Sequence, residues 1–268
     1  MPLILGWTIH GVLLYNTSED PEKEYQAILQ ALDHRVQGIL MLPVIGTKRR
    51  TVELLKKAEE DGIHVVLIDR NVPDGEFAAV FVDNRKTIYD GISLFLKAWH
   101  EKIGIITCPE VLRDGMTRLD GYVACLADVG IVLRKEYIYQ GDFSQESGYQ
   151  ACLYFRTLPD PPTAVLATCS SETLGCIRYL NENGLTPGLD VGLIGFDDIS
   201  TLNTIGYPVT MLDCPMRSMG EVAYEMLNDR MNGRTDEKKC KRVLMESRIL
   251  IRGSERRGGR NYAGYGVK

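Results

Sequence analysis

The sequence predicts an α/β protein built on parallel, doubly wound sheets. Short apolar runs that are typical of buried strands alternate along the chain with stretches of helical periodicity. Such alternation is typical of parallel sheets that carry helices on both faces. The length of 268 residues suffices for one large or two mid-sized domains, each with a core of its own.

The first part of the chain contains two helices with clear boundary signals. Asp20 and Pro21 supply an N-cap and a first-turn proline. A second helix is expected over residues 47–61, because Gly62 then falls where a left-handed residue ends a helix. The strands expected in this part are residues 10–15, 38–42, 65–69 and 80–82.

The same alternation continues through the remaining chain. Helices are expected over residues 88–99, 119–126, 144–158, 172–183 and 216–231. Strands are expected over residues 103–107, 137–140, 164–167, 191–195 and 243–250. In open parallel sheets, ligands bind beyond the carboxyl ends of the strands. Candidate site residues are therefore sought directly after these strands.

The composition excludes several kinds of protein. The apolar runs are too short to span a bilayer, and the first residues lack the basic start of a signal peptide. The 7 cysteines form no C-x-x-C pair, and the 4 histidines show no metal-ligand spacing. We therefore expect reduced thiols, a cytoplasmic location, no membrane partner, no metal and no cofactor.

Charge and motifs argue against DNA binding by this chain alone and against catalysis. The net charge is −5, and residues 256–268 form a basic tail that is expected to be disordered. An acidic body does not attract DNA. The sequence contains no P-loop, G-x-G-x-x-G, H-E-x-x-H or G-x-S-x-G motif, so we expect a binding protein and not an enzyme.

Several short motifs, in a specific order and spacing, together resemble the LacI/GalR family of transcription regulators. They are residues 15–21 (YNTSEDP), 38–40 (GIL), 67–70 (LIDR), 82–84 (VDN), 118–122 (RLDGY), 141–143 (GDF), 146–149 (ESGY), 162–165 (PTAV), 193–198 (LIGFDD) and 252–254 (RGS). The resemblance implies a periplasmic-binding-protein-like type I core with two lobes. It assigns residues 1–82 and 212–235 to lobe one, and residues 83–211 and 240–255 to lobe two.

By this resemblance, a small molecule, most simply a sugar, closes the cleft and so modulates DNA binding. Family members contact DNA through an N-terminal helix-turn-helix head, which is not visible in this sequence, and a homodimer is compatible with the family. The family's core also begins with a strand and a helix that have no counterpart before residues 10–15, so lobe one is expected to be incomplete. The alternatives are a solute-binding protein of a sugar transporter and a sugar or nucleoside hydrolase.

Three candidate ligand residues belong to lobe two. The resemblance implies that Asp197 accepts hydrogen bonds from ligand hydroxyls, although an aspartate in a turn or at a helix N-cap would have the same sequence signal. Arg118 resembles the family's ligand-binding arginine and offers a planar fork of donors, or is a surface arginine at the start of a helix. The resemblance implies that Phe143 places its ring face against the ligand, with packing on its own lobe as the alternative.

Two further candidates are Asp69 and Ser170. Asp69 ends a strand and resembles a carboxylate of the family's cleft, with a capping role as the equal alternative. Asp83 and Asn84 are interpreted as a cap of the next helix. Cys169 and Ser170 replace the amide and acid residues that the family carries there, so Ser170 or Ser171 either contacts the ligand or caps the helix that follows.

Overall fold

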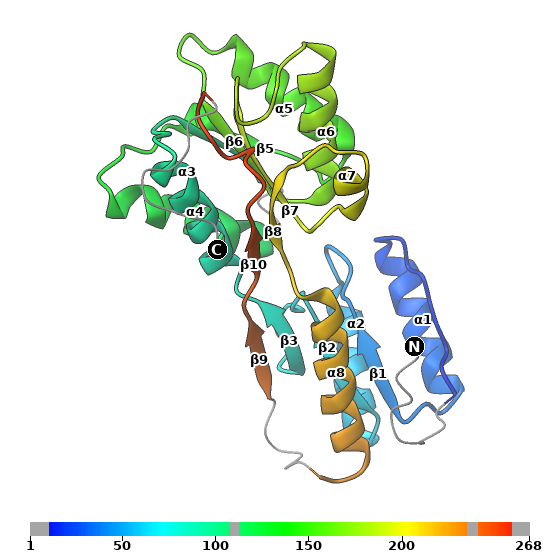
Figure 1. Cartoon of the computed structure of the whole chain (residues 1–268). Helices are drawn as coiled ribbons and strands as arrows, with labels where there is room; N and C mark the ends of the chain where they lie inside the picture. The colour runs from blue at the N-terminus through cyan, green and yellow to red at the C-terminus, as the bar shows by residue number, and fades with distance from the viewer. Residues whose placement is uncertain (1–10, 108–112, 235–240, 259–268) are drawn as a thin grey trace. The chain divides into compact units, whose positions relative to one another are not determined.

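The computed structural model describes residues 11–107, 113–234 and 241–258 (Figure 1), and the structural statements below refer to them. The chain divides into two compact units. Unit 1 comprises Met1–Val80 and Gly220–Arg242, and unit 2 comprises Phe81–Met219 and Val243–Lys268. No helix among the described residues is both long and apolar enough to cross a membrane.

Unit 1 contains a four-stranded sheet in the order β1-β2-β3-β9, in which β1, β2 and β3 run parallel. The strands are β1 (Gly38–Met41), β2 (His64–Ile68), β3 (Ala78–Val82) and β9 (Arg242–Met245), and the helices are α1 (Pro21–Asp33), α2 (Arg49–Glu60) and most of α8 (Met216–Met231). The division between the units runs through β3, α8 and β9. The Asp20 carboxylate accepts hydrogen bonds from the first turn of α1, which confirms the predicted cap.

The sequence predicts that the second helix begins at Thr47, but α2 begins at Arg49. The Thr47 hydroxyl donates to the carbonyl of Val44 and lies 3.2 Å from the buried carboxylate of Glu24. These bonds hold the residue in the loop that precedes the helix. Gly62 follows α2 with a φ of 82°, as predicted.

The segment after His10 differs from the prediction. A strand is predicted over residues 10–15, but residues 11–15 form no strand within the described chain, and His10 lies outside it. This segment, α1 and β1 line a hollow of about 1270 Å³. Val12 and Leu14 are 83% and 93% exposed. A strand forms only where its backbone groups find a neighbour, and no described residue supplies one here.

Unit 2 contains a six-stranded sheet in the order β10-β8-β7-β6-β4-β5. The strands are β4 (Ile103–Thr107), β5 (Ile138–Gln140), β6 (Ala164–Ala167), β7 (Gly192–Phe196), β8 (Thr210–Asp213) and β10 (Arg248–Leu250). The helices are α3 (Asn84–Lys97), α4 (Arg113–Asp128), α5 (Gln145–Thr157), α6 (Ser170–Glu182), the short α7 (Ser200–Thr204) and the 3-10 turn η1 (Lys135–Tyr137). All strand pairs except β8 with β10 are parallel.

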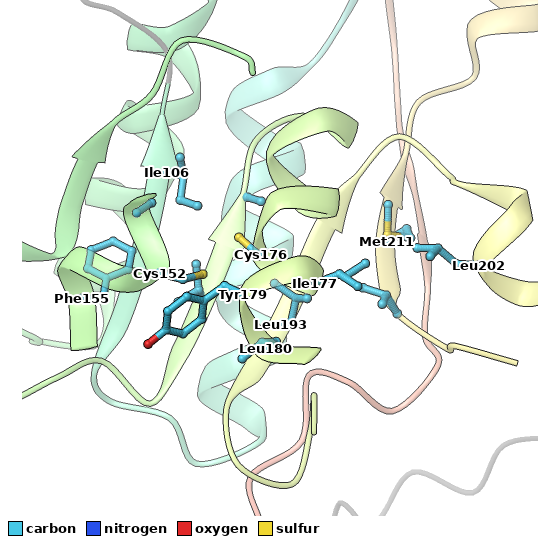
Figure 2. Close-up of a cluster of buried hydrophobic side chains, with 14 residues drawn as sticks. Ile106, Cys152, Phe155, Cys176, Ile177, Tyr179, Leu180, Leu193, Leu202 and Met211 are labelled. Carbon is cyan, nitrogen blue, oxygen red and sulfur yellow. The ribbon is translucent and has the colours of Figure 1, made fainter. Parts of the chain in front are cut away.

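Helices cover both faces of this sheet, as the doubly wound prediction requires. The side chain of Leu166 in β6 packs against Gly91 of α3. Its neighbours Val165 and Ala167 belong to a buried cluster with residues of α5 and α6. Figure 2 shows this cluster and labels Phe155 of α5 and Ile177 of α6. Successive residues of a strand face opposite sides, so β6 is buried on both.

The helices α5 and α6 approach each other closely through two glycines. A Cβ on Gly148 would lie 2.1 Å from the carbonyl oxygen of Glu172, and one on Gly175 would lie 2.0 Å from that of Gln145. No other residue fits at either position without separating the helices. This contact places the loop before α5 beside the N-terminus of α6.

The structure differs from the prediction for residues 243–250. One strand is predicted over residues 243–250, but β9 and β10 are separate strands of two different sheets. Ser247, between them, hydrogen-bonds through its hydroxyl to Thr87 at 2.6 Å. The helix α7 and the strand β8 lie between residues 195 and 216, where no helix or strand was predicted from the sequence.

Candidate ligand-binding site

Arg118 is held by three contacts from three elements. The sequence places it at the start of a helix, but α4 begins at Arg113, so Arg118 lies in the second turn. Its Nε donates to Asn84 Oδ1 at 3.0 Å, and its Nη1 donates to the carbonyl of Thr168 at 2.7 Å. The guanidinium also lies 4.2 Å from the ring centroid of Phe196. These bonds use two of the five N–H donors of a guanidinium and orient its fork.

Three of the candidate residues share an unusual backbone conformation. Asp69, Phe143 and Asp197 have φ angles of 63°, 64° and 58°. Aspartate tolerates the left-handed region, but for a bulky residue such as phenylalanine it is an outlier. Such strain costs about 1–3 kcal/mol and is concentrated at functional sites. The backbone at Phe143 therefore requires support from its surroundings.

Asp197 follows β7 directly, and its side chain is half-buried. Its backbone N–H donates to the carbonyl of Leu212 in β8 at 2.9 Å. The next residue, Asp198, forms an ion pair of 2.7 Å with Arg252. Asp197 is not a helix N-cap, because Ile199 occupies that position before α7.

Phe143 lies in the loop between β5 and α5. The Ser144 hydroxyl caps α5 by accepting the N–H of Ser147 at 2.9 Å, and Asp142 Oδ1 accepts the N–H of Ser144. Hydrogen bonds from the side chain and from the backbone N–H of Ser144 lower the pKa of Asp142. The N–H of Phe143 itself donates to Oε1 of Glu172 at 3.3 Å. The loop is thus fixed both by its own helix cap and by α6.

The N-terminus of α6 corrects the expectation of a serine cap. The N-cap is Cys169, whose sulfur accepts the N–H of Glu172 at 3.4 Å, and Ser170 is the first residue of the helix. Burial raises the pKa of the Cys169 thiol to about 12, so the thiol stays protonated at neutral pH. The half-buried Ser170 lies two residues beyond the carbonyl that Arg118 binds.

Asp69 belongs to unit 1, whereas the other four candidates belong to unit 2. It follows β2, and its N–H donates to the carbonyl of Val80 at 2.8 Å. The next residue, Arg70, pairs with Glu19 at 2.7 Å and donates to the carbonyl of Pro43 at 3.2 Å.

Two important residues were not among the predicted candidates. Asp83 caps α3 by accepting the N–H of Lys86, as predicted, but the adjacent Asn84 is buried and orients Arg118. Glu172 is fully buried, and its Oε2 has no hydrogen-bond partner among the described residues. From sequence, Asn84 looks like part of a cap, and Glu172, at the third position after Cys169, looks like half of a capping box.

Burial raises the pKa of Glu172 to about 7. Hydrogen bonds from Cys169 and from the N–H of Phe143, and the positive charge of Arg118, act in the opposite direction. The carboxyl group thus lies at the point where the loop of Phe143, the cap of α6 and the guanidinium of Arg118 approach one another.

Four predicted residues therefore surround the carboxyl ends of the strands of unit 2: Arg118, Phe143, Ser170 and Asp197. Contacts to Thr168 and Phe196 connect Arg118 with the ends of β6 and β7. The described residues contain no group of three or more His, Cys, Asp or Glu side chains that could hold a metal ion. An oriented guanidinium, a carboxylate and a ring can together bind a polar small molecule.

The chain is similar to known proteins in both sequence and fold. The sequence profile of the periplasmic binding protein-like domain matches residues 92–254. The HTH-type transcriptional repressor CytR of Escherichia coli (strain K12) is 29% identical over 249 residues, which are 92% of this chain and 71% of CytR.

Two solved structures are also similar to the chain. Transcription regulator CcpA of Lactococcus lactis has a TM-score of 0.79 at 21% identity and shares the fold, over 90% of this chain and 86% of CcpA. A complex of transcriptional regulator CelR with cellobiose has a TM-score of 0.74 at 25% identity, over 87% of this chain and 70% of CelR.

Proposed function

Because the chain belongs to the periplasmic binding protein-like domain family, we propose that it is the effector-sensing part of a LacI-type transcriptional repressor. The relatives that it matches over most of its length are repressors, which favours sensing over solute transport or hydrolysis. In this proposal the protein is not an enzyme and acts in the cytoplasm.

The site of unit 2 carries the proposal. Its central feature is Arg118, whose guanidinium is oriented by Asn84, Thr168 and Phe196. Guanidinium donors and the carboxylate of Asp197 complement the hydroxyl groups of a sugar, which both donate and accept hydrogen bonds. The ring of Phe143 suits the apolar face of a sugar. A sugar ligand is also consistent with the cellobiose complex of CelR.

We further propose that units 1 and 2 correspond to the two lobes, residues 1–82 with 212–235 and residues 83–211 with 240–255. Asp69 would then be the contribution of lobe one, and Ser170 a further contact from lobe two. Ligand binding shifts such a protein toward a closed state only by its higher affinity for that state. In this proposal the change reaches DNA through a head domain and a homodimer.

Isothermal titration calorimetry against monosaccharides, disaccharides including cellobiose, and nucleosides tests this function. We expect at least one sugar to bind, and Arg118→Ala and Asp197→Ala each to lower its affinity about ten- to hundredfold, since hydrogen bonds to charged groups contribute about 1.5–3 kcal/mol. The matched controls are Arg156→Ala and Asp120→Ala, two exposed residues of unit 2. Binding that survives both site substitutions unchanged would place the ligand elsewhere.

A further inference from the structure

The conformation of Phe143 needs an external support. A left-handed backbone at a bulky residue persists only where the surrounding structure determines it. Two contacts reach the Phe143 peptide from α6: its N–H donates to Glu172 Oε1 at 3.3 Å, and its carbonyl oxygen lies 3.9 Å from the sulfur of Cys169. The second contact is long and involves a weak donor. The Glu172 carboxylate is therefore the main hydrogen-bonding partner of this peptide from outside the loop.

Glu172 is closely fitted to the loop. A Cβ on Gly141 would lie 2.2 Å from Glu172 Oε1 and 2.7 Å from the hydroxyl oxygen of Ser147. The carboxylate thus occupies the space where a side chain at residue 141 would be. The side chain is 0% exposed, in a place where an apolar residue would avoid the cost of burying a carboxyl group. A buried polar group with this cost requires an explanation.

We propose that Glu172 is a positioning residue of the ligand site, which holds the Phe143 backbone in its left-handed conformation and so directs the ring toward the ligand. This role rests on the proposed function, because the purpose of the arrangement is ligand contact by Phe143. Glu172 acts through Phe143 and does not itself touch the ligand.

A helix-capping role alone does not account for the geometry. In a capping box, the glutamate at the third helical position bonds back to the N–H of the N-cap residue. Here the carboxylate accepts hydrogen bonds from Cys169 and from the backbone of Thr168 at its own helix end, and Oε1 also crosses to the loop before α5, where it accepts the N–H of Phe143. A capping glutamate also has no need for complete burial, whereas Glu172 lies beneath the loop that it supports.

The charge of Glu172 is expected to change near neutral pH. Burial raises its pKa to about 7. The titratable groups nearest to it are the Arg118 guanidinium of α4 and the thiols of Cys169 and Cys176, while α5 contributes the uncharged Ser147. Both thiols have raised pKa values, and a guanidinium stays protonated. An ionised carboxylate accepts a stronger hydrogen bond than a neutral carboxyl group. The amide resonance of Phe143 should therefore shift when Glu172 ionises.

The amide resonance of Phe143 in the ¹⁵N-labelled full chain tests the inference without any ligand. We expect this resonance to titrate with a midpoint near the pKa of Glu172, about 7. Glu172→Gln keeps an acceptor oxygen but no charge, so the titration should vanish while the amide stays hydrogen-bonded. Glu172→Met removes the acceptor, and the amide should exchange with solvent at least tenfold faster. Glu182→Gln, at the other end of α6, is the control and should behave as wild type.

Two outcomes would overturn the inference: a Phe143 amide that does not titrate between pH 5.5 and 8.5, or one that titrates equally in Glu172→Gln. The ligand readout is separate. If cellobiose binds the wild type, Glu172→Met should weaken it about tenfold and Glu172→Gln should weaken it less, because one hydrogen bond is lost only in the former. If no sugar binds, the proposed function fails, while the amide titration still decides the role of Glu172.

Discussion

The central strands of unit 2 and the edge strand β1 of unit 1 are built from similar apolar residues, yet they are buried to very different extents. In unit 2, every residue of β6 and β7 is buried, and each strand pairs with a neighbour on both sides. In unit 1, β1 pairs only with β2 among the described residues, and Leu40 is 39% exposed beside the hollow of about 1270 Å³. An apolar run therefore predicts a strand. Whether that strand is buried depends on whether strands from elsewhere in the chain pair with it on both sides.

The hollow of unit 1 and the site of unit 2 also differ in size and in the groups that define them. The hollow exceeds the usual range of about 300–1,000 Å³ for small-molecule pockets, and a strand edge forms part of its lining. The site of unit 2 is defined instead by polar groups that are held in place, such as Arg118. We therefore expect the ligand to bind at the complete sheet of unit 2, and we expect the open edge of unit 1 to be the less stable region.

The largest expected contrast is between one leucine of each sheet. Leu166→Ala removes a side chain that is 0% exposed, and we expect it to lower the free energy of unfolding by about 2–5 kcal/mol. Leu40→Ala, at 39% exposure, should cost less than about 1 kcal/mol. Urea titrations followed through amide resonances of each unit measure both, because two units can unfold separately. Equal losses would remove the contrast.

The second contrast concerns pH. Because the folded-state pKa of Glu172 is about 7 against an ordinary value of 4.5, the folded protein binds this proton more tightly than the unfolded chain. The contribution to stability is complete below about pH 4.5 and is lost as the pH rises to about 7, a change of roughly 3 kcal/mol. Glu172→Gln should remove this slope, which urea unfolding of both proteins at a series of pH values measures.

Burial also raises the pKa of Glu24 in unit 1, and its slope has the same sign. The difference between wild type and Glu172→Gln therefore isolates the contribution of unit 2. An unchanged slope in the variant would show that Glu172 ionises normally in the folded protein.

The smallest contrast uses the same glycine-to-alanine change in both units. In Gly175→Ala the new Cβ would meet backbone, with Gln145 O at 2.0 Å, so α5 and α6 must separate at a cost of about 1–3 kcal/mol. In Gly38→Ala its nearest neighbours would be atoms of the flexible Leu227 side chain, with Cδ1 at 2.7 Å. We expect that change to lie within about 1 kcal/mol of neutral. Thermal unfolding that ranks them in the opposite order would contradict the packing described for α5 and α6.

Local signals in the sequence were sufficient for much of the fold. Asp20 and Gly62 act through contacts within a few residues, so their roles at helix ends were predictable. The strand predicted over residues 10–15 was wrong because strand formation requires a distant partner. The strand expected over residues 243–250 was divided for a related reason, since its two halves pair in different sheets.

The same distinction applies to the candidate site. Asp197, Arg118 and Phe143 were chosen because they follow strands or match a family motif, and their role in ligand binding remains a prediction. Asn84 and Glu172 resemble ordinary caps in the sequence, and only the folded chain shows that they contact Arg118 and Phe143. Residues that position others are recognised by distant contacts, which a local pattern does not contain.

Chemical-shift mapping of the ¹⁵N-labelled chain with the sugar that calorimetry identifies tests the central claim most directly, because it compares both regions at once. We predict that the largest amide shifts cluster in unit 2, at residues 142–144, 168–171 and 197–198. The Arg156→Ala control, which changes an exposed residue outside the site, should show the same shifts. Shifts concentrated instead around the hollow of unit 1, at residues 38–42 and 224–231, would contradict the assignment of ligand binding to unit 2.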